Sequence, residues 1–248
     1  MSNGHASARR GVPSTLRTGG FLVLAWTGVA APPLLAQVGH EPGSSPFRDV
    51  TTRQELTLFG GRFGGNPGEA GVGARSGPIT GLRFATRLSG PLELTVTFAS
   101  INSSRYVIDP DSPVTVRTTG PVNYDLVTAD LGMLFNLTGR KTWRGFAPYL
   151  GMAIGLEIPA NGTTDPGGYE AKQNFTFVPT FGTRVTLSRS LALQLEIRDY
   201  FIRYEYPLRY FEPTDTTVPP VLDPTRYDEK DLTSNWTISL GLSYRFTF

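Results

Sequence analysis

Charged side chains stand at alternating positions in several segments of this 248-residue chain, and each has apolar neighbours. The members of this set are five arginines and four acids: Arg83, Arg87, Glu93, Asp130, Glu157, Arg184, Glu196, Arg198 and Arg245. Guanidiniums mixed with carboxylates can form a network of buried ion pairs or line a narrow path for water and ions. A carboxylate pair such as Glu157 and Glu196 can also exchange protons with a substrate, although pairing with arginine is the commoner role. We expect a structural ion-pair network, with the pore lining as the alternative.

Catalysis has little support in the residue types available. Both histidines, His5 and His40, precede all of these charges, so no histidine can act there as a general base. The chain has no cysteine, which excludes a thiolate nucleophile, a disulfide and a thiolate zinc site. The only lysines lie in predicted connections, and the aspartates of those connections lack the spacing of a calcium-binding loop: Lys141, Lys172, Lys230, Asp109, Asp111, Asp223 and Asp231. We therefore expect no catalytic residue, no cofactor and no metal ion.

The charges must be positioned by β-strands, because each lies on one face of a segment with a two-residue period. The clearest segment is the last, Trp236–Phe248, in which apolar or aromatic residues alternate with small or polar ones without interruption. Seven earlier segments show comparable patterns: 55–63, 79–88, 92–99, 123–137, 146–158, 174–187 and 191–204. A change of phase near Gly60-Gly61 and the proline at Pro179 each suggest a β-bulge.

The connections between these segments alternate in length. Those after the first, third, fifth and seventh strands have about 14 to 25 residues, and those after the second, fourth and sixth have about three to eight. Transmembrane barrels have short turns at one end and long loops at the other. The sequence therefore predicts an all-β fold, an eight-stranded antiparallel up-and-down transmembrane β-barrel, with apolar faces toward lipid and charged faces toward the axis. Aromatic residues toward both ends predict two interfacial belts. Those toward the long-loop end are Tyr106, Tyr124, Tyr204, Tyr206 and Trp236, and those toward the other end are Phe135, Trp143, Phe146, Tyr244 and Phe246.

The beginning of the chain reads as an export signal. Three arginines precede an apolar run, Phe21–Ala31, that is shorter than the roughly 20 residues of a membrane-spanning helix. We expect a signal peptide over 1–36, a periplasmic lead-in over 37–54 and the barrel over 55–248. Removal of the first 36 residues leaves 20 basic and 21 acidic side chains, which gives no support for nucleic-acid binding.

The closing strand carries a family resemblance. Gly241, Tyr244, Phe246 and Phe248 resemble the C-terminal assembly signal of bacterial outer-membrane β-barrels, and the architecture resembles the small barrels of the OmpX, OmpA-transmembrane-domain and OmpW kind. The resemblance implies residence in the outer membrane of a Gram-negative cell. It also implies contact with membrane lipid and lipopolysaccharide, delivery by periplasmic chaperones, insertion by the barrel assembly machinery, and a monomeric state.

The resemblance leaves the function itself open between classes. The first hypothesis is a non-enzymatic barrel whose lumen is filled by charged side chains and whose loops serve envelope integrity or surface interaction. The alternative is a narrow channel or carrier for small or hydrophobic solutes, as in OmpW-like proteins. A lipid-modifying enzyme is a remote third, because no barrel histidine is available.

Overall fold

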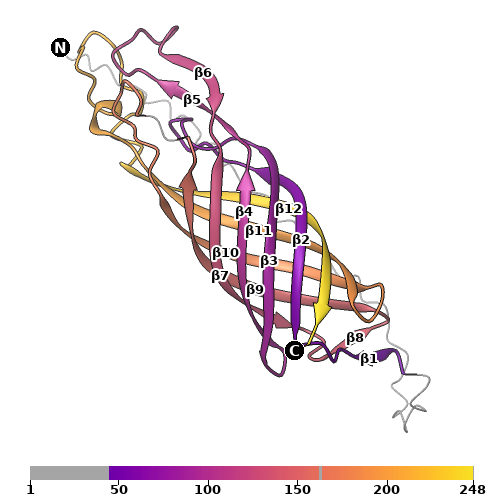
Figure 1. The fold of residues 1–248 in the computed structure, drawn as a ribbon. Coiled ribbons are helices and arrows are strands. Elements are labelled where there is room, and N and C mark those ends of the chain that lie inside the picture. Colours follow the sequence, from indigo (N-terminus) through magenta and orange to yellow (C-terminus); the bar gives the residue numbers. More distant parts are fainter. Residues whose placement is uncertain (1–44, 162–163, 248) are drawn as a thin grey trace, which may run out of the picture. The chain divides into compact units, whose positions relative to one another are not determined.

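Eight long strands dominate the structure, a computed structural model that describes residues 45–161 and 164–247 (Figure 1). The predicted signal peptide and Phe248 lie outside the described residues. The strands are β2 (Gln54–Gly64), β3 (Gly77–Ser89), β4 (Leu92–Ile101), β7 (Leu126–Asn136), β9 (Phe146–Pro159), β10 (Asn174–Thr186), β11 (Leu191–Glu205) and β12 (Lys230–Phe246).

These strands form a closed antiparallel barrel. Each pairs with the next along the chain, and β12 pairs with β2 to close the ring. Following paired residues once around the barrel leads from Tyr149 back to the same strand at Pro159, ten residues farther on. Closure with such a stagger tilts strands by about 35–45° and leaves an interior about as wide as its side chains. The predicted fold class is confirmed.

Smaller elements lie at the two ends of the barrel. Beyond the end with long connections, β5 (Ser104–Ile108) and β6 (Thr118–Asn123) form a hairpin within a segment expected to be loop, and η1 (Leu208–Tyr210) is a single turn of 3-10 helix. At the end with short turns, β1 (Phe47–Asp49) pairs with β8 (Lys141–Trp143), as the ribbon shows (Figure 1). None of the described residues belongs to a helix that is long and apolar enough to cross a bilayer.

Two sequence expectations about strand irregularity are wrong. β2 keeps one register with β12 and β3 through Gly60 and Gly61, so no bulge lies there. Its apolar residues change face instead, because Leu58 points outward whereas Phe59 and Phe63 are buried inside. On β10, Pro179 pairs in register with β9, and the register with β11 is the same on both sides of it. The irregularity observed in the barrel lies in β3, between Arg87 and Ser89.

The exterior of the barrel is apolar over most of its strand length. Leu131, Phe181 and Leu240 point outward, and each has about half of its surface exposed, at 50%, 53% and 58%. Similar side chains surround them on neighbouring strands: Leu150, Met152, Ile154, Leu195, Ile197, Ile238 and Leu242. A continuous apolar belt of this extent is stable against hydrocarbon and not against water. The chain is therefore a transmembrane β-barrel, with oily residues outward and charges inward.

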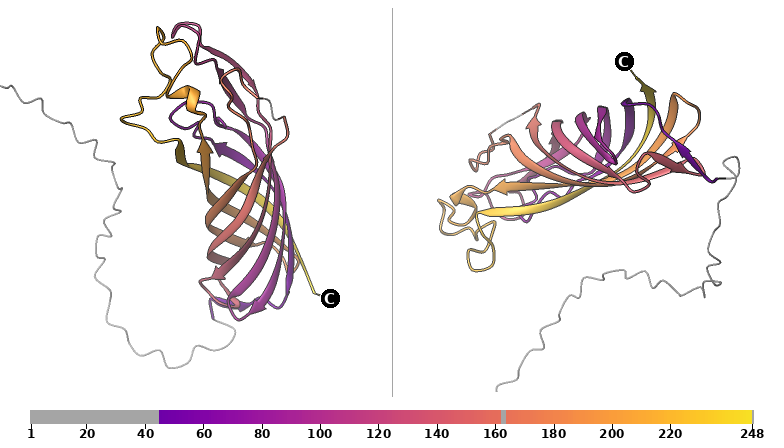
Figure 2. Two further views of the ribbon diagram at one scale, coloured as in Figure 1. Left: turned by 90° about the vertical axis from the view of Figure 1, so that its left-hand side faces the viewer. Right: turned by 90° about the horizontal axis from the view of Figure 1, so that it is seen from below.

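The long connections gather at one end of the barrel (Figure 2). Their own apolar residues are buried there. Val72 and Ala74 of the connection after β2, and Leu222 of the connection after β11, are buried in the same cluster as Phe63 and Ile101 of the barrel. Tyr124, Tyr204 and Tyr206 also belong to this cluster. The interfacial belt expected from these three tyrosines is therefore wrong, although Trp236 does point outward.

Candidate functional site: the charged lumen

The lumen collects most of the charged residues selected from the sequence. Eight of the nine have less than a tenth of their surface exposed: Arg83, Glu93, Asp130, Glu157, Arg184, Glu196, Arg198 and Arg245. Arg87, at the short-turn end of β3, is half-buried and donates a hydrogen bond to the carbonyl oxygen of Val50 at 3.0 Å. The strands place the eight on the inner face because inward and outward positions alternate along each of them.

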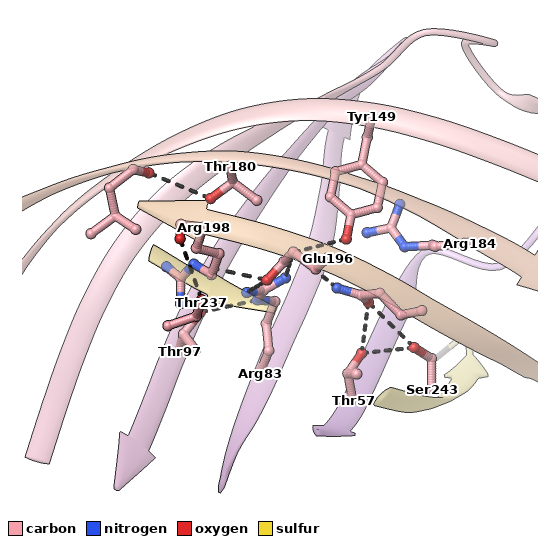
Figure 3. Close-up of polar contacts among 12 residues, drawn as sticks. Thr57, Arg83, Thr97, Tyr149, Thr180, Arg184, Glu196, Arg198, Thr237 and Ser243 are labelled. Carbon is pink, nitrogen blue, oxygen red and sulfur yellow. Dashed lines mark hydrogen bonds and ion pairs between the residues drawn. The ribbon is translucent and has the colours of Figure 1, made fainter. Parts of the chain in front are cut away.

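A central ion cluster consists of Arg83, Asp130, Glu196 and Arg198. Figure 3 shows Arg83, Glu196 and Arg198 of this cluster. The guanidinium of Arg83 on β3 grips the Glu196 carboxylate on β11 through both terminal nitrogens, with Nη2 at 2.5 Å from Oε1. Arg198 donates through Nη2 to Oδ1 of Asp130 at 2.8 Å, which joins β11 to β7. These strands are not neighbours in the ring, so the ion pairs cross the lumen.

A terminal ion cluster lies toward the short-turn end and consists of Glu55, Glu93, Arg184 and Arg245. Arg184 on β10 donates to Glu55 on β2 through Nε and to Glu93 on β4 through Nη2, each at 2.8 Å. The second oxygen of Glu55 accepts from Nε of Arg245 at 2.9 Å. Arg184 also donates to Oδ1 of Asn136 at 2.8 Å, so all three guanidinium nitrogens are used.

Tyr149 connects the two clusters. Its hydroxyl donates to Oε2 of Glu196 at 2.8 Å, and its ring lies 4.6 Å from the guanidinium carbon of Arg184 (Figure 3). The ring occupies space left by Gly182 on β10, because a Cβ there would overlap the tyrosine. Gln194 donates to the same glutamate oxygen at 3.1 Å. The carboxylate thus has donors on several sides, which a buried charge requires.

Charge is balanced within each cluster, with two arginines and two acids. The set differs from the predicted one by the entry of Glu55, which the sequence left out because the facing of its strand was uncertain. The inward face of β2 begins with polar Glu55 and Thr57 but continues with Phe59 and Phe63. Because this face is both polar and aromatic, the sequence did not show which way Glu55 points. Arg87 takes no part in either cluster, and neither oxygen of buried Glu157 has a hydrogen-bond partner.

A separate buried ion pair, absent from the sequence expectations, holds the long-loop end. Arg105 of β5 and Asp165 of the connection after β9 are each 1% exposed and bond through both terminal nitrogens, at 2.8 and 2.5 Å. Burial alone lowers the pKa of Arg105, but the hydrogen bonds and charge of Asp165 raise it to above its ordinary value. The rings of Tyr124 and Tyr169 stand 5.5 and 5.6 Å from this guanidinium, and burial raises the pKa of both tyrosines.

Exposed parts of the long connections are tied together as well. Asp111 accepts hydrogen bonds from the backbone N–H of Thr214 at 2.6 Å and from the Arg209 guanidinium. Desolvation raises the pKa of Asp111, but the backbone N–H groups of Thr214 and Asp215 and the Arg209 guanidinium together lower it by more, so the net pKa is below the ordinary aspartate value. These contacts join the connection inside the β5–β6 hairpin to the one that follows β11.

The short-turn end is also covered. The backbone of residues 50–53 runs over it, with the N–H of Val50 bonded to the carbonyl of Arg140 and the N–H of Arg53 to that of Phe246. The space beneath, bordered by Glu55, Glu93 and Arg184, has a volume of about 30 Å³, comparable to the volume of one water molecule. Within the parts of the chain that the structure describes, no three histidine, aspartate or glutamate side chains converge as a metal site.

The residues of the predicted assembly signal lie on the strand that closes the barrel. Tyr244 and Phe246 have outward positions on β12, and their rings stack at 5.9 Å. Gly241 faces inward against β2, where an added Cβ would come within 2.7 Å of the Thr57 methyl group. A larger residue at this position would therefore displace the Thr57 side chain.

Comparisons with known proteins give structural likeness only. No protein-family model matches the chain, and no curated protein matches it in sequence. Among solved structures, the outer-membrane protein OprG of Pseudomonas aeruginosa is 12% identical, with a TM-score of 0.49 over 82% of this chain and 100% of that one. Neisserial surface protein A is 12% identical, with a TM-score of 0.48 over 82% and 98%. The N-terminal barrel domain of P. aeruginosa OprF is 12% identical, with a TM-score of 0.45 over 79% and 98%. TM-scores at this level do not support an assignment. The fold is assigned from the closed pairing of the strands alone.

Proposed function

We propose that this chain is an integral protein of the bacterial outer membrane that acts as a closed, non-enzymatic barrel. Its charged lumen serves as a rigid support for ordered extracellular loops, which contribute to envelope integrity or to interactions at the cell surface. Lipid and lipopolysaccharide surround it, and periplasmic chaperones and the barrel assembly machinery deliver and insert it as a monomer. In this orientation the short turns face the periplasm and the long connections face outward.

One observation carries the closed-barrel proposal: eight of the nine charged side chains buried in the lumen form ion pairs with one another, and Glu157 is the exception. Four arginines and four acids form ion pairs, most of them across the barrel. The long connections pack over one end, and the backbone of residues 50–53 covers the other. An ion that entered would have to replace these partners in a low-dielectric interior, at a cost of several kcal/mol per charge. The absence of any histidine after His40 supports the non-enzymatic part of the proposal.

Conductance across a planar lipid bilayer tests the proposal. The wild-type protein, shown to be inserted by its altered gel mobility without boiling, is expected to give no steady single-channel openings. The variant E196A is the positive comparison, because loss of the carboxylate leaves Arg83 free to attract water and anions, and intermittent openings are expected. Steady openings of the wild type that disappear when Arg83 or Glu196 is replaced would establish the channel alternative instead.

Residence in the outer membrane has its own test. Membrane fractionation of the expressing cell should place the protein with the outer membrane, and deletion of Phe248 should lower the assembled amount while export continues. Recovery in the soluble periplasmic fraction in a folded form would contradict the proposed location, whatever the conductance result.

A further inference from the structure

The periplasmic rim of the barrel carries an excess of positive charge that ion pairs do not neutralise. Among the described residues, the lead-in, the short turns and the last residues of β3 together contain one acid, Asp49, and seven basic residues: Arg48, Arg53, Arg87, Arg140, Lys141, Arg144 and Arg189. The long connections at the other end are rich in acids instead. Basic residues repel one another when they are clustered, so an uncompensated cluster indicates an anionic partner.

Three of these arginines surround a crevice. It lies between β1, the β8–β9 turn and the β10–β11 turn, and has a volume of about 610 Å³, within the roughly 300–1,000 Å³ of small-molecule sites. Arg48, Arg144 and Arg189 line it and are all exposed. Among the described residues none of the three forms an ion pair, although the Arg144 guanidinium lies 5.4 Å from the Trp143 ring centre.

The remaining walls of the crevice are suited to a phosphate group. They contribute hydroxyls that can donate to anionic oxygens, from Thr51, Thr52 and Ser188. Thr142 and Arg245 also line the crevice, but the Thr142 hydroxyl already donates to the carbonyl of Arg48 and Arg245 is engaged by Glu55. Guanidinium and hydroxyl donors are the groups that proteins use to bind phosphate. Asp49 is the one acid in the lining, and its negative charge is smaller than the combined positive charge of Arg48, Arg144 and Arg189.

The crevice opens beside the lipid-facing surface of the barrel. This position favours a ligand that has acyl chains as well as an anionic group over a free anion. Leu187 is part of its lining and is 56% exposed. Trp143 and Phe146 stand next to it with nearly half of their surfaces exposed. Aromatic side chains with basic neighbours are typical of the level where acyl chains meet headgroups.

From this arrangement we propose that the crevice formed by β1, the β8–β9 turn and the β10–β11 turn binds the headgroup of an anionic phospholipid from the inner leaflet. The phosphate lies among Arg48, Arg144 and Arg189, and an acyl chain follows Leu187 and Phe146 along the barrel wall. The bound lipid would hold the β1–β8 ribbon against the membrane surface. This inference rests on the membrane orientation proposed above, but its test is carried out in detergent and does not depend on location or conductance.

Native mass spectrometry of the full-length protein with added phosphatidylglycerol tests the site, with phosphatidylcholine of the same acyl chains as the neutral comparison. We expect one retained phosphatidylglycerol per protein, bound at least about tenfold more tightly than phosphatidylcholine. The variant R48Q/R144Q/R189Q should bind it about tenfold or more weakly. The matched control R62Q/R203Q/R226Q removes the same charge from the long-loop end of the barrel. It should bind phosphatidylglycerol within about twofold of wild type. Altered gel mobility before boiling verifies folding of both variants.

A second measurement applies if the crevice variant fails to fold. In the W26F/W236F protein Trp143 is the only tryptophan, and phosphatidylglycerol with brominated acyl chains should quench it more strongly than brominated phosphatidylcholine does at equal mole fraction. Equal weakening by the two triple variants, equal quenching by the two lipids, or equally tight binding of glycerol phosphate without acyl chains would each overturn the proposal. The last result would identify a site for free anions.

Discussion

Replacement of Glu196 by glutamine is the most direct test of the claim that the lumen is dry and held by ion pairs. Glutamine keeps the size of the side chain and can still accept from the Tyr149 hydroxyl, but it removes the charge that Arg83 grips through two nitrogens. Arg83 is 3% exposed and would keep the hydrogen bond from its Nε to Thr97 at 3.1 Å and at most a bond to the neutral amide oxygen, with no carboxylate bonded to it. A buried charge that loses its partner costs about 3–5 kcal/mol, so the free energy of unfolding should fall by that amount.

The reciprocal change should cost less. In R83M the Glu196 carboxylate keeps its hydrogen bonds from Tyr149 and Gln194, and Arg198 remains 3.8 Å away, so we expect a loss nearer to about 3 kcal/mol. The double variant R83M/E196L replaces both charges by apolar groups of similar volume. Its loss should be at least about 2 kcal/mol smaller than the sum of the two single losses.

Equilibrium unfolding by urea in lipid vesicles at neutral pH measures these differences, followed by tryptophan fluorescence and by gel mobility. The matched control is E170Q, which removes the partner of Lys172 in an exposed pair whose members are 67% and 53% exposed, and which should cost less than about 1 kcal/mol. If E196Q costs no more than E170Q and the double variant is additive, water solvates Arg83 and the closed-lumen reasoning is wrong.

Three further changes probe other parts of the structure. G182A should push aside the Tyr149 ring and lower the free energy of unfolding by about 1–3 kcal/mol, measured by the same urea titration. R105Q should release the connections at the long-loop end while the barrel remains folded, seen as faster trypsin cleavage there than in the exposed-arginine control R226Q. The Asp111 tie should be present above the ordinary aspartate pKa and be lost as the pH falls through its depressed value, detected as increased amide exchange near residue 214.

Strand number, pairing order and the two kinds of end could be predicted from the sequence because each depends on local patterns. Alternation identified every long strand, and the lengths of the connections gave the antiparallel order that β12 and β2 close. The membership of the ion clusters could not be read in the same way. Arg184 and Glu55 are far apart in the chain and pair across the barrel. They lie at the same level only because of the ten-residue stagger of the closed ring, which the sequence does not show.

The connections at the long-loop end were the largest failure of prediction. We expected them to be loops, but the β5–β6 hairpin and the buried pair of Arg105 and Asp165 lie within them. Composition averaged over a long segment hides a few apolar side chains that meet in space. Val72 and Leu222, far apart in the chain, are buried in one cluster and give no periodic signal of their own.

The side chains that face the lumen change from polar to apolar toward the long-loop end of the barrel. This change explains why the alternation of apolar and polar residues along β2 and β11 is not uniform. Inside the lipid belt, the outward face must be apolar, and an apolar inner face as well would make each strand a continuous hydrophobic stretch. Such a stretch could be held in the inner membrane during export, whereas alternation with charges keeps the strand polar enough to pass. Beyond the belt the outward face meets water and the constraint reverses. On β11 the outward positions then become Arg203 and Glu205, and the inward ones Ile202 and Tyr204. Phe63 of β2, next to outward Arg62, lies at the level where the strand leaves the hydrocarbon, whereas Phe59 lies within the lipid belt, at the level of outward Leu58 and Leu240.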